Sequence, residues 1–174
     1  MSKKVVELMP SDFSETFLYL NGRRFSLTDY PYLRAVYNCS DPRVVLKFSR
    51  QTAKSTTLSN IMVTKSIMHP HFKTLYISPS VDQTKVFSHD RVAPVLEQST
   101  FVKKHYLNST LIQNVFMKQL LNGSRMYLRY AHLNADRVRG YSSDMCLFDE
   151  VQDQLEDNIP VIEETMSRSL HKFS

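Results

Sequence analysis

Three short apolar segments, each followed by a stretch with helical periodicity, limit most strongly what this chain can fold into. The apolar segments are residues 43–48 (RVVLKF), Lys73–Ser78 (KTLYIS) and residues 144–149 (DMCLFD). Runs of β-branched and apolar residues of this length are typical of buried strands. The stretches with helical periodicity are residues 55–68, 82–98 and 151–170. Because strands and helices alternate, we predict an α/β fold with a mainly parallel central sheet flanked by helices.

A β-hairpin is predicted between the second helix and the last apolar segment. Asn122-Gly123 separates two arms, residues 111–121 and 125–131, and an Asn-Gly pair favours the tight turns of hairpins. The pattern of the first arm also suits a helix, so both interpretations stay open for it.

Length and composition favour one globular domain. A chain of 174 residues suits a single large core, and we place an N-terminal region at residues 1–42 before a core region at residues 43–174. No apolar run approaches the roughly 20 residues that a membrane-spanning helix needs, so we expect no membrane partner. Cys39 and Cys146 lie far apart in the sequence, which favours a reduced intracellular compartment.

Charge is distributed unevenly along the chain. Residues 1–139 contain 20 lysines and arginines against 9 acidic residues, whereas residues 140–174 contain 2 against 8. A basic body suits a polyanionic partner, because contacts with phosphates provide affinity that does not depend on sequence. A solvated surface without such a partner explains the charge equally well.

The segment before the first helix has the reactive end of a phosphate-binding loop. Residues 48–56 read FSRQTAKST, whereas the usual pattern is G-x-x-x-x-G-K-[ST], so Phe48 and Ala53 replace both glycines. Such loops turn backbone N–H groups and a helix N-terminus toward phosphate oxygens. Lys54 would contact the β- and γ-phosphates of ATP, and the Ser55 hydroxyl would bind Mg²⁺. By itself, a Lys-Ser pair after a strand more often only begins a solvated helix.

Two adjacent carboxylates end the last apolar segment. Asp149 and Glu150 would lie at the carboxyl end of a strand, which is where open α/β sheets place their ligands. Asp149 would hold the hydrated Mg²⁺ ion, and Glu150 would polarise the attacking water. Such a pair alone is often only the acidic start of a helix. The two motifs together, with alternating strands and helices between them, favour a P-loop nucleoside triphosphatase.

Three segments resemble the large terminase subunits of tailed phages. SRQTAKSTT is similar to that family's phosphate loop, which also lacks the first glycine and carries an arginine, here Arg50. ADRVRGYSSD, followed by CLFDEVQD, is similar to the family's approach to its Walker B strand. FSLTDYPYLR resembles the aromatic segment that seats adenine. The three matches occur in the family's order and together span roughly residues 25–153.

The resemblance implies a role for each matching position. Arg50 would act as an arginine finger that neutralises charge on the γ-phosphate, and Glu150 would be the catalytic carboxylate. Ser55 and Asp149 would hold Mg²⁺. The implied ATP-binding set consists of the loop and the aromatic segment: Ser49, Arg50, Gln51, Thr52, Ala53, Lys54, Ser55, Thr56, Tyr30, Tyr32 and Arg34. Within the loop, the backbone amides of Gln51, Thr52 and Ala53 would face the phosphates. For the aromatic residues, ordinary packing on the core is an equal alternative.

The resemblance also implies a function and partners. The chain would be the ATPase part of a DNA-packaging motor that moves double-stranded DNA into a procapsid. Its partners would be the portal protein, the small terminase subunit and other copies of itself in a ring, in the host cytoplasm and transiently at the portal. The family's coupling motif and nuclease domain have no counterpart before Ser174. We therefore expect a P-loop fold that is incomplete at its C-terminal end, without nuclease activity.

Two alternatives come from the same residues. Residues 149–153 (DEVQD) also resemble a motif of superfamily 1 helicases, although those enzymes normally keep the glycines that this phosphate loop lacks. The other alternative is a catalytically degenerate P-loop module that binds DNA or partner subunits without turnover. If position 53 needs a positive φ, its methyl group would cost about 1–2 kcal/mol.

Overall fold

The computed structural model describes residues 8–49, 52–131, 138 and 140–169. Its centre is a four-stranded sheet with the strand order β4-β5-β3-β6. β3 runs parallel to both of its neighbours, and β4 is antiparallel to β5. The bounds of the strands are Lys73–Ser78 (β3), Met117–Gln119 (β4), Arg125–Tyr130 (β5) and Met145–Phe148 (β6). The predicted α/β fold with a mainly parallel sheet is therefore confirmed.

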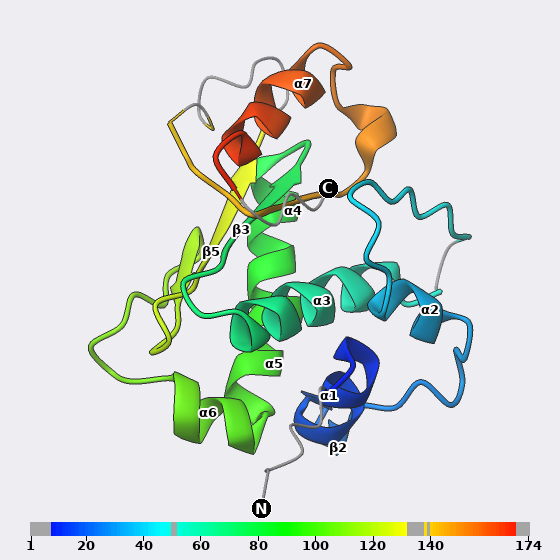
Figure 1. Ribbon diagram of the computed structural model, residues 1–174, viewed down its shortest axis with the longest axis vertical. Coiled ribbons are helices and arrows are strands. Elements are labelled where there is room, and N and C mark those ends of the chain that lie inside the picture. The colour runs from blue at the N-terminus through cyan, green and yellow to red at the C-terminus, as the bar shows by residue number, and fades with distance from the viewer. Residues whose placement is uncertain (1–7, 50–51, 132–137, 139, 170–174) are drawn as a thin grey trace, which may run out of the picture.

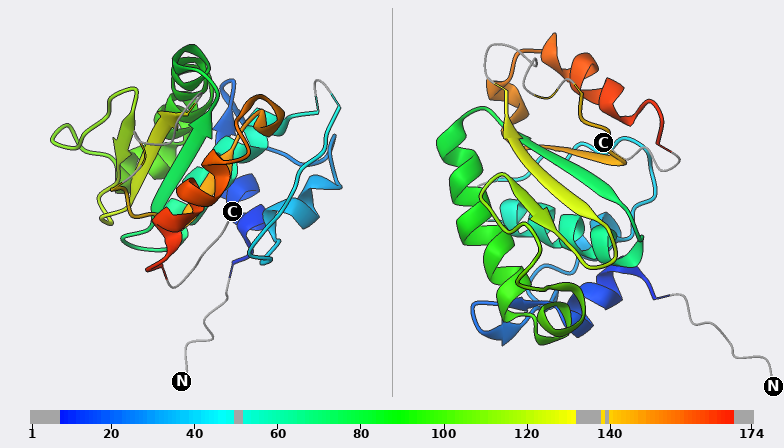
Figure 2. Two further views of the ribbon diagram at one scale, coloured as in Figure 1. Left: turned by 90° about the horizontal axis from the view of Figure 1, so that it is seen from above. Right: turned by 90° about the vertical axis from the view of Figure 1, so that its left-hand side faces the viewer.

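Helices cover both faces of this sheet (Figures 1 and 2). The first face packs against the larger group: α1 (Pro10–Phe17), α2 (Leu33–Tyr37), α3 (Lys54–Met68), α4 (Val81–Phe87), the π-helical segment η1 (Ser88–Val92), α5 (Ala93–Gln98) and α6 (Thr100–Tyr106). The second face packs against α7 (Asn158–Glu163) and the 3-10 helix η3 (Glu164–Met166). A small hairpin, β1 (Tyr19–Leu20) and β2 (Arg23–Arg24), follows α1.

The core divides between these two faces because successive residues of a strand point to opposite sides. On β3, Tyr76 belongs to the cluster that includes Met62 and Val63 of α3. Leu75 and Ile77 of the same strand belong to the smaller cluster with Ile162 of α7. The strand pattern of Lys73–Ser78 is thus explained by a strand buried on both faces.

Most predicted helices are present with small changes. The helix expected at residues 55–68 is α3, which ends two residues before Pro70. The single helix expected at residues 82–98 is α4, η1 and α5 in succession. The stretch at residues 151–170 forms η2 (Val151–Asp153), α7 and η3 instead of one helix. Pro160 lies in the first turn of α7, where its missing N–H disrupts no helical hydrogen bond.

The hairpin is also confirmed, with a first arm shorter than predicted. β4 pairs with β5 over three residues, and the helical alternative for this arm is not observed. Gly123 has a φ of +83°, so the connection uses the conformational freedom of this glycine. In the part of the chain that the structure describes, no helix combines the length and the apolar character needed to cross a membrane.

The strand predicted at residues 43–48 is wrong. The segment joins no sheet, and the side chain of Val45 is 88% exposed. A cleft of about 340 Å³ lies between residues 43–46 and β6, which is the last strand of the described sheet. A strand needs a hydrogen-bonding neighbour at about 4.8 Å, and no backbone hydrogen bond among the described residues joins this segment to β6. The apolar pattern of residues 43–48 indicates a segment that could form a strand. The pattern does not determine whether another strand lies close enough to pair with it.

Candidate functional site

The start of α3 and the end of β6 meet at one edge of the sheet. Lys54 is the first residue of α3, and Asp149 and Glu150 directly follow β6. The Lys54 Nζ lies 3.2 Å from Asp149 Oδ1. Lys54 also forms an ion pair with Glu150, which is 96 positions further along the chain. The fold therefore brings the phosphate-loop lysine and both predicted carboxylates together.

Electrostatics keep Lys54 charged in this position. Burial alone lowers the pKa of Lys54, but the hydrogen bond to Glu150 and the charge of Asp149 outweigh it, so the pKa lies above 10.5. A raised folded-state pKa means that this contribution to stability is complete at neutral pH. It is lost only as the pH rises through the pKa of Lys54. At physiological pH, the ammonium thus neutralises part of the charge of two carboxylates.

The loop before α3 reaches the helix through a left-handed residue. Ala53 has a φ of 60° and a ψ of 21°, and its carbonyl accepts the N–H of Thr57 at 2.8 Å to begin the helix. Thr52 Oγ1 donates to the carbonyl of Ser49 at 2.7 Å. The position that carries glycine in the usual motif therefore does have a positive φ here. For alanine, this conformation costs about 1–2 kcal/mol.

The other loop residues are placed in part. Ser55 and Thr56 lie half-buried in the first turn of α3, and Ser49 is exposed. Arg50 and Gln51 lie outside the described residues, so their predicted roles stay predictions. In the described part of the chain, no group of three or more His, Cys, Asp or Glu side chains could hold a metal. Mg²⁺ commonly takes only one or two carboxylates together with phosphate oxygens, which the oxygen donors of Ser55 and Asp149 fit.

Asp149 is fixed by residues that the sequence did not reveal. Its side chain is buried, and Oδ2 accepts a hydrogen bond from the Tyr76 hydroxyl at 2.9 Å. Oδ1 accepts the backbone N–H of Glu150 at 3.1 Å. The side-chain amide of Gln154 donates to the backbone carbonyl of Asp149 at 2.9 Å. Tyr76 occurs inside an ordinary strand pattern, so only the pairing of β3 with β6 could identify it.

Glu150 has an unusual backbone conformation. Its φ is 49°, which is left-handed and uncommon for a residue other than glycine. Its carboxylate accepts hydrogen bonds from Lys54 on one oxygen and from Gln152 on the other. Strained residues of this kind concentrate at functional sites. Gln152 lies two residues after Glu150, and the sequence alone does not indicate its contact with Glu150.

A largely apolar cleft adjoins these charged groups. Lys54, Glu150 and Gln152 line one part of the cleft of about 340 Å³. Its other walls come from α2, α3, β6, α7 and the segment of residues 39–46. The predicted adenine residues Tyr30, Tyr32 and Arg34 are not among the side chains that line it.

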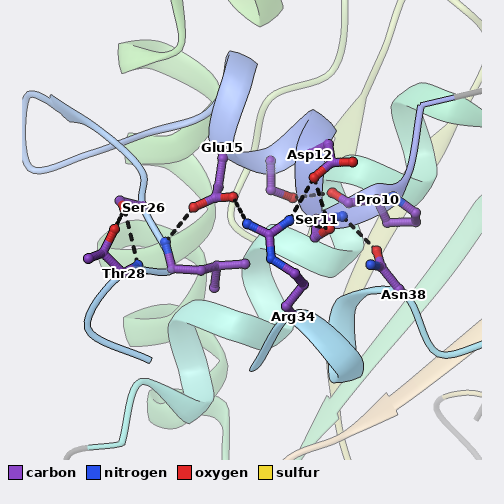
Figure 3. A network of polar contacts seen from close by, with 10 residues as sticks. Pro10, Ser11, Asp12, Glu15, Ser26, Thr28, Arg34 and Asn38 are labelled. Carbon is purple, nitrogen blue, oxygen red and sulfur yellow. Dashed lines mark hydrogen bonds and ion pairs between the residues drawn. The ribbon is translucent and has the colours of Figure 1, made fainter. Parts of the chain in front are cut away.

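Arg34 joins α2 to α1 instead of facing the cleft (Figure 3). Its guanidinium donates to Asp12 at 2.7 Å and forms an ion pair with Glu15. Glu15 also accepts the backbone N–H of Leu27 at 2.8 Å, so one carboxylate holds two segments. In the same group, the side chain of Asn38 accepts the backbone N–H of Ser11 at 2.9 Å. A contact of Arg34 with adenine stays a prediction. The hydrogen bonds of this network give Arg34 a structural role, because they connect α2 to α1.

The two tyrosines lie closer to the phosphate loop. The rings of Tyr32 and Phe48 make an edge contact with centroids 6.1 Å apart, and Tyr30 and Tyr32 make a similar contact at 6.3 Å. Tyr32 is half-exposed, whereas Tyr30 packs partly against the core. The aromatic segment therefore contacts the residue that precedes Ser49.

One family model matches most of the chain. Residues 21–163 match the family described as the ATPase domain of the phage terminase large subunit gpA. A search of curated protein sequences found no match. The matched residues include both predicted motifs, and the family is not one of helicases.

Solved structures show the same fold. The large terminase of bacteriophage HK97 superposes with a TM-score of 0.76 at 12% identity, covering 94% of this chain and 35% of that one. The ATPase domain of the Thermus phage P74-26 large terminase has a TM-score of 0.57 at 19% identity, and a variant of it 0.61 at 20%. Each of these comparisons covers 76% of this chain and 58% of the other. This chain thus spans about a third to somewhat more than half of the length of these proteins.

Proposed function

We propose, from the premise that this chain belongs to the family of ATPase domains of phage terminase large subunits, that it hydrolyses ATP with the aid of Mg²⁺. One observation carries the proposal. Lys54 at the start of α3 contacts Asp149 and Glu150 at the carboxyl end of β6. A cation that binds phosphates and two carboxylates beside it are the groups that phosphoryl transfer to water requires.

The residues would take the following roles. Phosphates of the nucleotide would compete with both carboxylates for the Lys54 ammonium. When Lys54 contacts the phosphates, Asp149 and Glu150 would be released from their ion pairs. Ser55 and Asp149 would hold Mg²⁺, which when bound neutralises charge on the phosphates. Glu150 would accept a proton from the attacking water, and Gln152 would hold its carboxylate in place. Arg50 would donate to the γ-phosphate, and the amides of Gln51, Thr52 and Ala53 would face the phosphates.

Coupling of this hydrolysis to movement of double-stranded DNA is also part of the proposal. The partners would be the portal protein, the small terminase subunit and further copies of this chain, in the host cytoplasm and at the procapsid portal. Exposed basic side chains such as Lys103 and Lys104 of α6 support a DNA contact. Arg129 is a poorer candidate, because its guanidinium already donates to Tyr141 and to the carbonyl of Phe116.

A P-loop module without turnover is the second candidate. Two observations favour it, namely the left-handed alanine at position 53 and the absence of residues 43–48 from the sheet. Both would leave the phosphate loop less firmly held than a loop that follows a paired strand. Such a module would bind DNA or a partner subunit regardless of nucleotide.

The test is ATP hydrolysis by the purified chain with Mg²⁺, with and without double-stranded DNA. The wild type is compared with Lys54→Ala and Glu150→Gln, and Lys85→Ala on the exposed part of α4 is the control. We expect both site variants to lose at least about 100-fold in rate, as is typical for catalytic groups of this kind. Lys85→Ala is expected to retain the wild-type rate.

The binding of nucleotide separates the two candidates. Hydrolysis that survives both Lys54→Ala and Glu150→Gln would contradict the assigned site. Nucleotide binding that depends on Lys54, with no hydrolysis by the wild type, would favour the module without turnover. If the wild type binds no nucleotide at all, the proposed ATPase function fails for this chain.

A further inference from the structure

Asp149 is the most enclosed of the charged groups at the site. It is only 9% exposed, and each of its carboxylate oxygens has a different set of partners. Oδ1 contacts the Lys54 ammonium at 3.2 Å and the backbone N–H of Glu150 at 3.1 Å. Oδ2 contacts the Tyr76 hydroxyl at 2.9 Å. The two oxygens therefore have different surroundings. Oδ1 faces Lys54 and the phosphate loop, and Oδ2 faces the interior of the sheet.

Tyr76 reaches Asp149 because of the register of β3 and β6. Tyr76 pairs with Leu147, and Asp149 is two residues further along. Residues two apart on a strand point to the same side, so Tyr76 and Asp149 are diagonal neighbours on one face. A diagonal neighbour is within reach of an aromatic side chain, whereas a serine or threonine at position 76 would be too short.

The tyrosine ring has little freedom to move. It is 1% exposed and stacks on Phe87 of α4 with centroids 3.8 Å apart and planes inclined by 1°. An ionised carboxylate can only accept hydrogen bonds, so the Tyr76 hydroxyl is the donor in its contact with Asp149. The hydrogen bond therefore has a fixed donor and a fixed direction.

We propose that Tyr76 is a positioning residue for Asp149, which holds Oδ2 from the sheet interior so that Oδ1 is presented to the phosphate and metal site beside Lys54. The inference rests on the proposed function of this site. When phosphates draw Lys54 away, Oδ1 loses its cation. Tyr76 and the amide of Glu150 then remain as the contacts that keep the carboxylate in its orientation.

The test is the variant Tyr76→Phe, which removes the hydroxyl and retains the ring that stacks on Phe87. Three quantities are measured: the Mg²⁺ concentration at half-maximal binding of a fluorescent ATP analogue, the affinity for that analogue in EDTA, and the melting temperature. We expect the Mg²⁺ midpoint to rise roughly tenfold, because a hydrogen bond to a charged group is lost. The affinity in EDTA should change less than about twofold, because the direct contacts with phosphate remain.

Tyr127→Phe is the matched control. Tyr127 lies on the neighbouring strand β5, where it pairs with Leu75, so it faces the opposite side of the sheet from Tyr76. It belongs to the core cluster beneath α7, away from Asp149. We expect Tyr127→Phe to leave the Mg²⁺ midpoint unchanged, even if its melting temperature falls.

The outcomes separate this inference from the proposed function. A wild type with Mg²⁺-dependent binding and a Tyr76→Phe variant with the same Mg²⁺ midpoint would overturn the inference alone. A lower melting temperature of Tyr76→Phe with an unchanged midpoint would do the same, because it would mean that the hydroxyl only stabilises the fold. A wild type without Mg²⁺-dependent binding would overturn the proposed function and, with it, the role of Tyr76.

Discussion

At the scale of single residues, two left-handed backbone conformations lie on either side of Lys54. Ala53 precedes it in the chain with a φ of 60°, and Glu150, which contacts its ammonium, has a φ of 49°. Each conformation costs about 1–2 kcal/mol for a residue with a Cβ. α3 begins directly after Ala53, and β6 ends two residues before Glu150, so each left-handed residue adjoins a regular element on one side.

Ala53→Gly is expected to stabilise the protein. Glycine adopts a positive φ without strain but loses more freedom on folding, so the net gain should be about 0.5–1 kcal/mol. The measurement is the free energy of unfolding in urea. Ala35→Gly is the control, because Ala35 is exposed in the helical backbone of α2, where glycine should destabilise by about 1 kcal/mol. Equal losses in both variants would mean that position 53 is not strained.

At the scale of elements, the turn between β4 and β5 closes the end of α3. The Asn122 side chain donates to the carbonyl of Ser66 at 2.9 Å, and the Ser124 hydroxyl donates to that of His69 at 3.0 Å. These bonds satisfy carbonyl groups that a helix end leaves without partners. The hairpin therefore holds the helix whose other end carries Lys54.

Gly123→Ala is expected to destabilise the protein by more than about 2 kcal/mol, because a methyl group would add a clash to the strain of a positive φ. A Cβ at position 123 would lie 2.3 Å from Nδ1 of His71. Gly22→Ala is the control, since Gly22 has a φ of +74° with no atom within 4 Å of the added Cβ, so only the strain of about 1–2 kcal/mol applies. Thermal unfolding measures both. Similar losses for the two variants would contradict the clash.

Val45→Thr is expected to change the free energy of unfolding by less than about 0.5 kcal/mol, because the side chain is already in water. Val45 is 88% exposed, whereas Val63 of α3 is 0% exposed. The control Val63→Thr buries a hydroxyl in the core and should cost about 1–3 kcal/mol. Urea unfolding compares the two. A large loss for Val45→Thr would indicate that residues 43–48 are packed in the sheet after all.

At the scale of the whole molecule, the basic and the acidic parts of the chain supply different parts of the fold. The basic residues 1–139 supply α1 to α6 and three strands of the sheet, whereas residues 140–174 carry 8 acidic residues and supply β6 and α7. Lys103 and Lys104 are exposed on α6, which packs on the opposite face of the sheet from α7. A polyanion would therefore be drawn to the face that carries α6.

Binding of double-stranded DNA is expected to weaken by more than about tenfold between roughly 50 and 200 mM salt, because contacts with phosphates release counterions. Fluorescence anisotropy with labelled DNA measures this. Exchanging both Lys103 and Lys104 for glutamate should weaken binding and reduce the salt dependence, whereas the single exchange Lys85→Glu on α4 should do so less. An affinity that does not depend on salt would contradict an electrostatic DNA contact.

Local patterns in the sequence determined much of this protein. The periodicity of residues 55–68 and of Lys73–Ser78 predicts α3 and β3, and the two motifs around Lys54 and Asp149 can be identified from the sequence alone. Such features follow from the sequence because helix and strand periods depend on residues a few positions apart. The resemblance to terminases rested on the same short segments.

Only the tertiary structure decided which segments become neighbours. It left residues 43–48 outside the sheet, engaged Arg34 with Asp12 and Glu15, and brought the Tyr76 hydroxyl to Asp149. In each case the deciding partner is distant in the sequence or lies across a cleft. The residue type determines which groups a side chain can bind. The order and register of the strands determine which groups it contacts.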